Sequence, residues 1–161
     1  MQSPADILKI SKSVYVDWQQ RVMDYGEKNN LPVICHLNLR HHFEFAKEFL
    51  SCFPRLRMNF PHFGFSRKKM HLLLDGFSNC YTDISGLYDY MAKDPAGYGD
   101  FIEHYSDRIM YGSDCAWNEA EKNETYLKGV EEMPLQNVSR RKLLYGVARE
   151  FLSGEPAGED V

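Results

Sequence analysis

The most constraining feature of this chain is a regular alternation of short apolar runs with longer amphipathic stretches. The apolar runs predict β-strands, and the stretches whose apolar residues recur at helical spacing predict helices. Strand–helix alternation along the whole chain is typical of parallel strands joined by crossover helices, so we expect an α/β fold. The expected strands cover 31–36, 55–62, 79–86 and 108–114, and the expected helices lie near 13–28, 40–52, 66–74, 98–105, 118–130 and 139–152.

The spacing of the expected strand ends sets the number of structural units. The strands end near His36, His62, Ile84 and Asp114, at intervals of 26, 22 and 30 residues. A complete (β/α)8 TIM barrel takes about 250 residues, or roughly 31 in each βα unit. With 161 residues, the chain is too short for such a barrel and holds about four βα units preceded by one helix.

Charge, hydropathy and cysteine usage exclude several kinds of partner. The net charge is −4, and the basic run Arg67-Lys68-Lys69 is interpreted as a solvated helix start, so we expect no nucleic-acid partner. No apolar run reaches the roughly 18 residues that a membrane helix needs, so we expect no membrane partner. The four cysteines form no CxxC pair and follow no secretory signal, which predicts reduced thiols in a cytoplasmic protein.

Metal-capable side chains stand at the carboxyl ends of three expected strands. They are His36, His62 and Asp114, and Asp83 lies near the end of the remaining strand, 79–86. In parallel α/β folds the chemistry sits at these strand ends, and imidazole and carboxylate groups are the usual ligands of zinc and similar divalent ions. Each residue also has a structural interpretation, because a strand-end histidine can serve as a hydrogen-bonded structural residue and an aspartate as a helix cap. For Asp83 we expect hydrogen bonding near Ser85.

Five short motifs, in order and at matching intervals, resemble one family. LPVICH is similar to the fifth barrel strand of the metal-dependent amidohydrolase superfamily in its amidohydrolase-2 branch, and KLLYGVAREFL is similar to its closing helix. FPRLRMNFPHFG, NCYTDISG and RIMYGSD resemble the sixth, seventh and eighth strands. The resemblance covers residues 13–152. It implies a partial TIM barrel built from strands 5–8, with one partial-barrel domain over 1–154 and a flexible tail over 155–161.

The resemblance also implies roles for the strand-end residues. His36 matches a metal ligand, and Asp114 matches a carboxylate that contacts the metal and takes a proton from metal-bound water. His62 matches a residue that ligates a second metal, holds the substrate, or acts as a general acid or base. The implied cofactor is a divalent metal, zinc first, with manganese or another ion as the alternative. From their place on loops after strand ends, Arg40 and Trp117 are candidate contacts to a small-molecule substrate.

Two functions remain open because the family's first-strand H-x-H pair is absent from the sequence. His41 and His42 do not replace it, because adjacent helix positions point about 100° apart. The first function is that of a metal-dependent hydrolase or decarboxylase of a small molecule, completed by a second copy or a complementary half-barrel chain. The alternative is a non-catalytic or truncated half-barrel remnant that forms homo-oligomers to bury its open sheet edges. A flavodoxin-type binding module is disfavoured because the sequence has no GxGxxG or GxxxxGK[ST] loop.

Overall fold

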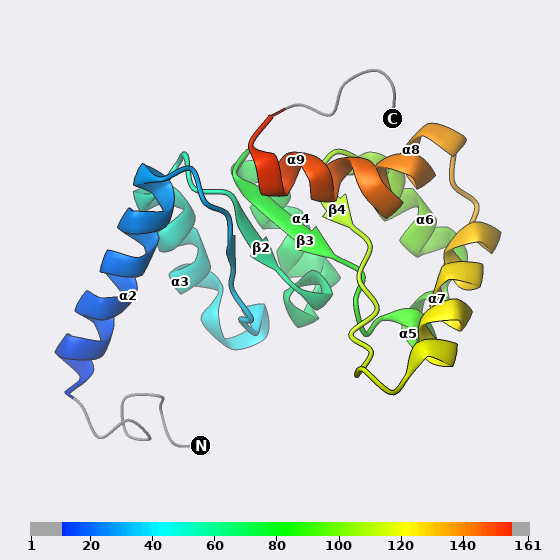
Figure 1. Cartoon of the computed structure of the whole chain (residues 1–161), viewed down its shortest axis with the longest axis horizontal. Coiled ribbons are helices and arrows are strands. Elements are labelled where there is room, and N and C mark those ends of the chain that lie inside the picture. The colour runs from blue at the N-terminus through cyan, green and yellow to red at the C-terminus, as the bar shows by residue number, and fades with distance from the viewer. Residues whose placement is uncertain (1–10, 156–161) are drawn as a thin grey trace.

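The computed structural model describes residues 11–155 and contains a four-stranded parallel sheet in the order β1-β2-β3-β4 (Figure 1). Each strand pairs in parallel with the next one along the chain, as crossover connections require. This confirms the predicted α/β fold with four successive βα units. The strands are β1 (Val33–Ile34), β2 (Met58–Phe60), β3 (Cys80–Asp83) and β4 (Ile109–Met110).

The helices fall close to their expected positions, with two differences. Asp94 accepts a hydrogen bond from the Gly97 backbone N–H at 3.0 Å, so α6 begins at Pro95, ahead of the expected residue 98. The expected helix 139–152 is divided by a π-helical segment, η2. The elements are α2 (Lys12–Lys28), α3 (Leu39–Cys52), the 3-10 turn η1 (His62–Phe65), α4 (Arg67–Gly76), α5 (Tyr88–Met91), α6 (Pro95–His104), α7 (Ala120–Glu132), α8 (Asn137–Arg141), η2 (Lys142–Gly146) and α9 (Val147–Ser153).

One face of the sheet carries the main core. Alternate strand residues such as Met58, Phe60 and Ile109 point to this face, where α3, α4 and α6 cover it (Figure 1). Leu50 and Leu73 from the covering helices are fully buried in the same cluster. This packing fixes the strands, and therefore also fixes the loops that follow their carboxyl ends.

The opposite face is covered only in part. Tyr81 and Met110 pack there against Val147 and Phe151 of α9, and the Tyr81 and Phe151 ring centroids are 5.2 Å apart. In Figure 1, α9 crosses in front of β3 and β4. Ile34 of β1 points to the same face, yet 68% of its surface is exposed. The helix α9 therefore covers this face at β3 and β4 but leaves it exposed at β1.

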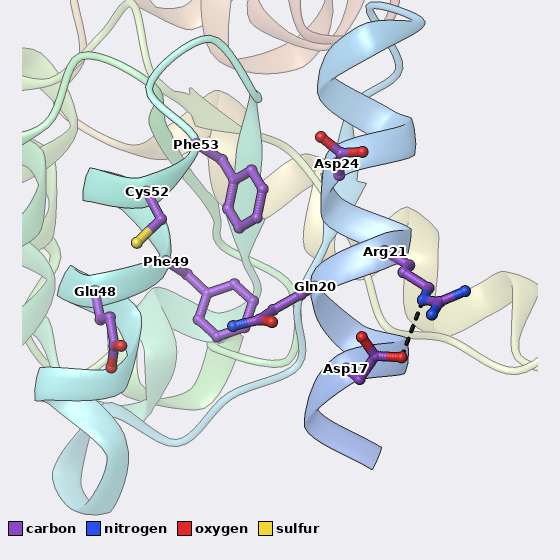
Figure 2. A pocket seen from close by; sticks show the side chains of 8 residues that line it. All are labelled: Asp17, Gln20, Arg21, Asp24, Glu48, Phe49, Cys52 and Phe53. Atoms are coloured by element: carbon purple, nitrogen blue, oxygen red, sulfur yellow. Dashed lines mark ion pairs between the residues drawn. The ribbon is translucent and has the colours of Figure 1, made fainter. Parts of the chain in front are cut away.

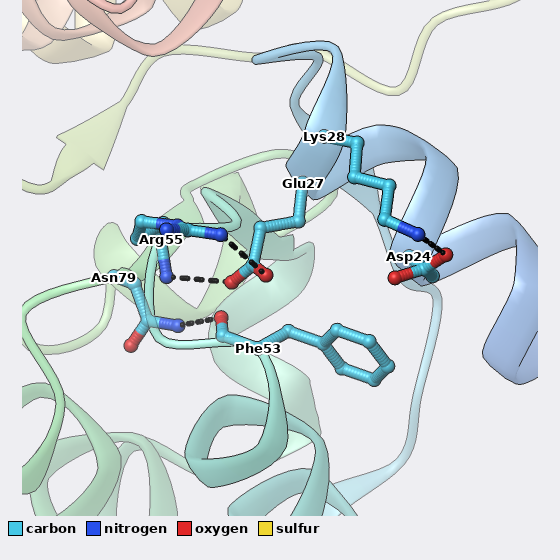
Figure 3. Close-up of polar contacts among 6 residues, drawn as sticks. All are labelled: Asp24, Glu27, Lys28, Phe53, Arg55 and Asn79. Carbon is cyan, nitrogen blue, oxygen red and sulfur yellow. Dashed lines mark hydrogen bonds and ion pairs between the residues drawn. The ribbon is translucent and has the colours of Figure 1, made fainter.

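The helix α2 is joined to the sheet by polar contacts at its carboxyl end (Figure 3). The Glu27 carboxylate accepts hydrogen bonds from the Arg55 backbone N–H at 3.0 Å and from its guanidinium at 3.4 Å. Next to this pair, the buried Asn79 amide donates to the Phe53 carbonyl at 2.9 Å. These contacts tie the segments before β2 and β3 to the end of α2.

The rest of α2 stands away from α3 and leaves an open groove of about 380 Å³ (Figure 2). The groove has an Asp17–Arg21 ion pair on the α2 side and Phe49 and Phe53 on the α3 side. Five apolar residues on α2 are exposed, namely Val14, Val16, Trp18, Val22 and Tyr25. Within residues 11–155, no helix is long and apolar enough to cross a membrane. The four cysteines are free thiols.

Candidate functional site

Two predicted site histidines meet at the carboxyl edge of the sheet. His36 follows β1, and His62 follows β2 through Pro61. Their ring centroids lie 5.2 Å apart at an interplanar angle of 78°, and the Phe65 ring lies 5.2 Å from each of them. The structure therefore brings His36 and His62 together, with Phe65 as an apolar neighbour to both.

The Asp114 carboxylate lies near His62, and Gly86 lies next to both side chains. A Cβ atom added to Gly86 would lie 3.4 Å from the Asp114 Oδ2 atom and 3.4 Å from the His62 Nδ1 atom. The backbone φ angle of Gly86 is +64°, a value that residues other than glycine adopt only at an energetic cost. The loop after β3 therefore passes beside His62 and Asp114 at a residue whose backbone conformation favours glycine.

The predicted metal ligands have suitable donor atoms, but they do not form a complete metal site. Across residues 11–155, no three His, Cys, Asp or Glu side chains are arranged to hold a metal ion. His36 and Asp114 are both exposed, and burial raises the pKa of the neighbouring Cys35 thiol, which keeps that sulfur protonated. The ligand roles of His36, His62 and Asp114 stay predictions.

A chain of hydrogen bonds fixes the proton on His62. Its Nδ1 atom lies 2.7 Å from the Ser85 carbonyl oxygen and 2.9 Å from the Ser85 hydroxyl oxygen. The Ser85 hydroxyl donates its own hydrogen to the Asp83 carboxylate, so it can only accept from the imidazole. Both neighbours of Nδ1 are acceptors, and Nδ1 must therefore carry the hydrogen. In the neutral imidazole, Nε2 is then left with a free lone pair.

The Asp83 carboxylate is the centre of this network and is buried, with 8% of its surface exposed. It also accepts hydrogen bonds from the backbone N–H groups of His62 at 3.2 Å and Ser85 at 3.1 Å. The Asn59 amide donates to its other oxygen at 2.7 Å. The expected hydrogen bonding of Asp83 near Ser85 is confirmed. Asn59 was missed, although a polar residue inside an otherwise apolar strand is a signal that could have found it.

The backbone of the site is strained. His62, Phe63, Phe65 and Asp114 have φ angles between +50° and +61°, a left-handed region that costs residues other than glycine about 1–3 kcal/mol each. Arg40 holds this turn by donating from Nε to the Phe65 carbonyl at 2.9 Å. Such strain persists only where the surrounding structure enforces it, and it is concentrated at functional sites.

A cavity of about 280 Å³ opens beside His62. Arg40, a predicted substrate contact, lines it, whereas Trp117 does not line it and is 96% exposed on the loop before α7. Sequence reasoning missed Arg67 and Tyr98, which also line the cavity. Burial raises the pKa of the Tyr98 hydroxyl, so that group stays neutral. A histidine with an open nitrogen thus borders a small cavity with cationic and aromatic walls.

Comparisons with solved structures show which fold this chain has. An uncharacterised TIM-barrel protein from Bordetella bronchiseptica is 19% identical, with a TM-score of 0.63, and the match covers 82% of this chain and 49% of that one. An amidohydrolase from Burkholderia multivorans is 16% identical, with a TM-score of 0.56 and coverage of 80% and 55%. A protein from Agrobacterium tumefaciens is 19% identical, with a TM-score of 0.58 and coverage of 84% and 55%.

The chain therefore has the fold of a partial TIM barrel and spans about half the length of the solved structures that it matches. Among curated proteins, none matches the chain. The sequence model of the amidohydrolase family matches residues 12–153, nearly all of the part that the structure describes. The chain belongs to the amidohydrolase family.

Proposed function

We propose that this chain carries the acid–base half of an amidohydrolase-type active site that acts on a small molecule. The observation that supports this most directly is the hydrogen-bond chain from Asp83 through Ser85 to His62 Nδ1. It fixes one tautomer of a histidine that borders a cavity, and leaves Nε2 without the hydrogen. A positioned imidazole of this kind is the most common general acid or base in enzymes.

Two reactions of the family suit this histidine. In hydrolysis of a C–N or C–O bond, Nε2 takes a proton from water as the water oxygen attacks the carbonyl carbon. It then returns this proton to the nitrogen or oxygen that departs as the C–N or C–O bond breaks. In decarboxylation, the same nitrogen, once protonated, gives its proton to the carbon that loses carbon dioxide. The exposed Asp114 carboxylate is the second group able to accept a proton, because Gly86 allows it close to His62.

The test is turnover by the full chain on a panel of lactones, amides and aromatic carboxylic acids, followed by mass spectrometry. Loss of a general acid or base typically reduces the rate by about 10²–10⁴-fold, so His62→Asn should lose activity by this factor. His104→Asn is the matched control, because His104 is exposed at the end of α6. Absence of turnover across the panel, with and without added Zn²⁺ or Mn²⁺, would refute the proposed catalytic function.

We further propose zinc as the divalent ion that the chain prefers, with manganese as the alternative. The support is the donor set, because imidazole nitrogens and a carboxylate oxygen suit zinc. Since the described residues form no complete group of three ligands, we expect binding far weaker than at a closed zinc site. Equilibrium dialysis with Zn²⁺ should give loose, saturable binding that His36→Asn reduces and His71→Asn, on α4, leaves unchanged. Equal binding by both variants would contradict the assignment.

A second candidate function is a non-catalytic half-barrel that pairs with a second copy of itself. The exposed apolar residues of α2 favour it, because an uncovered apolar stripe of this kind marks an interaction surface. Light scattering after size exclusion should then show a dimer that Trp18→Ser converts to a monomer. Trp117→Ser is the control, because Trp117 is exposed elsewhere. A monomeric wild-type protein would exclude this candidate.

A further inference from the structure

Four successive residues after β2 form one turn of left-handed backbone. His62, Phe63, Gly64 and Phe65 have φ angles of +59°, +50°, +55° and +61°, and Ser66 then returns to an extended backbone with a φ of −157°. This handedness is unfavourable for L-residues because it places Cβ too close to the carbonyl oxygen that follows, and glycine alone adopts it freely. Three of the four residues carry side chains, so contacts from the rest of the chain must hold the turn.

The peptide group between Phe65 and Ser66 is held from both sides. Its N–H, which belongs to Ser66, donates to the Phe63 carbonyl at 3.0 Å within the turn. Its carbonyl, which belongs to Phe65, accepts a hydrogen bond from the Nε atom of Arg40 at 2.9 Å. The first contact is local, whereas the second joins residues 25 positions apart and comes from α3. Through Arg40, another element of the fold therefore restrains the end of this turn.

The first turn of α3 is packed against η1. Leu39 is fully buried and lies so close to Gly64 that a Cβ atom there would overlap its side chain. The Asn38 side chain accepts a hydrogen bond from the Arg40 backbone N–H at 3.0 Å and caps the helix. At His42 the backbone leaves the helical conformation, with a φ of −127° and a ψ of +31°, so a kink separates this first turn from the rest of α3. The start of α3 is therefore fixed relative to η1, and Arg40 donates from a fixed position.

The Phe65 side chain connects this turn to both site histidines. Its ring centroid lies 5.2 Å from that of His36 and 5.2 Å from that of His62. Rotation about the N–Cα bond of Phe65 moves its carbonyl and its side chain together, because both are attached to Cα. A contact that holds the Phe65 carbonyl therefore also holds the ring against the two imidazoles.

We propose that Arg40 is a positioning residue, which orients His36 and His62 through the Phe65 carbonyl and ring. The inference rests on the proposed acid–base function of His62 and adds the residue that keeps its imidazole in place. A displacement of about 1 Å at a catalytic group can cost about 10²-fold in rate, so a turn that loses this restraint should slow the reaction. Since Arg40 also lines the cavity, the alternative is a direct contact to the substrate, and the two roles predict different kinetics.

Arg40→Met and Arg40→Gln separate the hydrogen bond from the rest of the side chain. Methionine places a methyl group, and glutamine an amide NH₂ group, where the Nε atom of arginine lies, and both remove the charge and the terminal nitrogens. The ring current of Phe65 affects the imidazole resonances of His36 and His62, so NMR of the full chain reports their arrangement directly. Arg40→Met should shift these resonances, and Arg40→Gln should leave them close to wild type. Arg55→Met is the control, because the guanidinium of this exposed arginine binds α2.

Kinetics on a substrate from the panel gives the second measurement. Arg40→Met should lower kcat by about 10- to 100-fold and leave KM unchanged, because substrate still binds but the histidine is misplaced. Arg40→Gln should restore kcat, because its amide again donates to the Phe65 carbonyl.

Imidazole resonances that Arg40→Met leaves unchanged, or equal kcat values for the two variants, would overturn the assignment. A rise in KM in both variants would also overturn it, because Arg40 would then contact the substrate directly. If Arg40→Met fails to fold, Arg40→Gln alone still distinguishes the two roles through KM. If the wild-type chain turns over no substrate, the proposed function fails, and the imidazole resonances alone decide the positioning role.

Discussion

Replacement of Asp83 tests whether one buried carboxylate organises the site. Asp83 accepts hydrogen bonds from four donors, namely the backbone N–H groups of His62 and Ser85, the Ser85 hydroxyl and the Asn59 amide. A buried donor left without an acceptor costs about 1–3 kcal/mol. The N–H of His62, which is half-buried, can turn to water, and three donors remain. We therefore expect Asp83→Ala to lower the free energy of unfolding by about 3–9 kcal/mol.

Asp83→Asn should lower the free energy of unfolding much less than Asp83→Ala. The new side chain keeps one oxygen for the same acceptor role but turns an NH₂ group toward the NH₂ group of Asn59. The Asn59 carboxamide oxygen is buried and has no hydrogen-bond partner within residues 11–155. Rotation of the Asn59 amide by half a turn presents this oxygen to the new donor and satisfies both groups. The remaining cost is the loss of charge-assisted hydrogen bonds, about 1–2 kcal/mol.

Urea denaturation measured by circular dichroism gives these differences, with Asp89→Ala as the exposed control expected within about 0.5 kcal/mol of wild type. Nitrogen NMR of His62 gives a second readout, because protonated and bare imidazole nitrogens differ in chemical shift. The Ser85 carbonyl oxygen, 2.7 Å from Nδ1, remains an acceptor without Asp83, so both variants should keep the His62 hydrogen on Nδ1. If the alanine and asparagine variants are equally stable, the carboxylate does not organise the site.

Three further changes have defined outcomes. Gly86→Ala should destabilise the fold by about 1–2 kcal/mol, because an L-residue is strained at its positive φ, whereas Gly76→Ala, with open space around its Cβ, should be neutral or stabilising in thermal melts. Burial and a hydrogen bond to Asp75 raise the pKa of Tyr105 to about 12. Because the unfolded chain loses this proton near pH 10, stability should fall as the pH rises from about 10 to 12, and Tyr105→Phe should flatten this fall in unfolding curves. Asn79→Leu should cost about 2–4 kcal/mol in urea denaturation, because one buried amide serves the carbonyls of Leu50, Phe53 and Leu56.

The sequence pattern predicted the order and type of the main elements because hydrophobic periodicity is a local property. The sequence pattern overestimated the length of the strands, which are between two and four residues long in the structure. β1 and β4 each have one neighbouring strand in the sheet, so part of each apolar run has no ladder to join. It also missed the π-helical segment. There the Tyr111 backbone N–H binds the Leu143 carbonyl at 2.7 Å, a contact across 32 residues that draws this carbonyl away from its own helix.

The candidate site likewise has residues that the sequence could predict and features that depend on the folded chain. His62 and Asp83 were found because strand ends are visible in the sequence, and the carboxyl ends of parallel strands share one edge. The tautomer of His62 was not predictable, since it depends on the Ser85 acceptors that lie beside Nδ1 only in the folded chain. Arg67 was interpreted as a solvated residue because its burial comes from Asp94 and Tyr98, which lie far along the sequence.

The position of α9 bears on how a complete barrel could arise from this half. In a TIM barrel the interior is filled by layers of side chains from the strands alone. Here that face of β3 and β4 is occupied by α9, whose Val147 and Phe151 are buried against Tyr81 and Met110. Four more strands could close the ring only if α9 left this face and exposed both apolar side chains to water, at about 1.5–3 kcal/mol each. Ring closure and the packing of α9 over this face therefore exclude each other. A second copy that binds the exposed face of α2 requires no such displacement, because α2 lies at the end of the sheet beside α3, whereas α9 covers β3 and β4 (Figure 1).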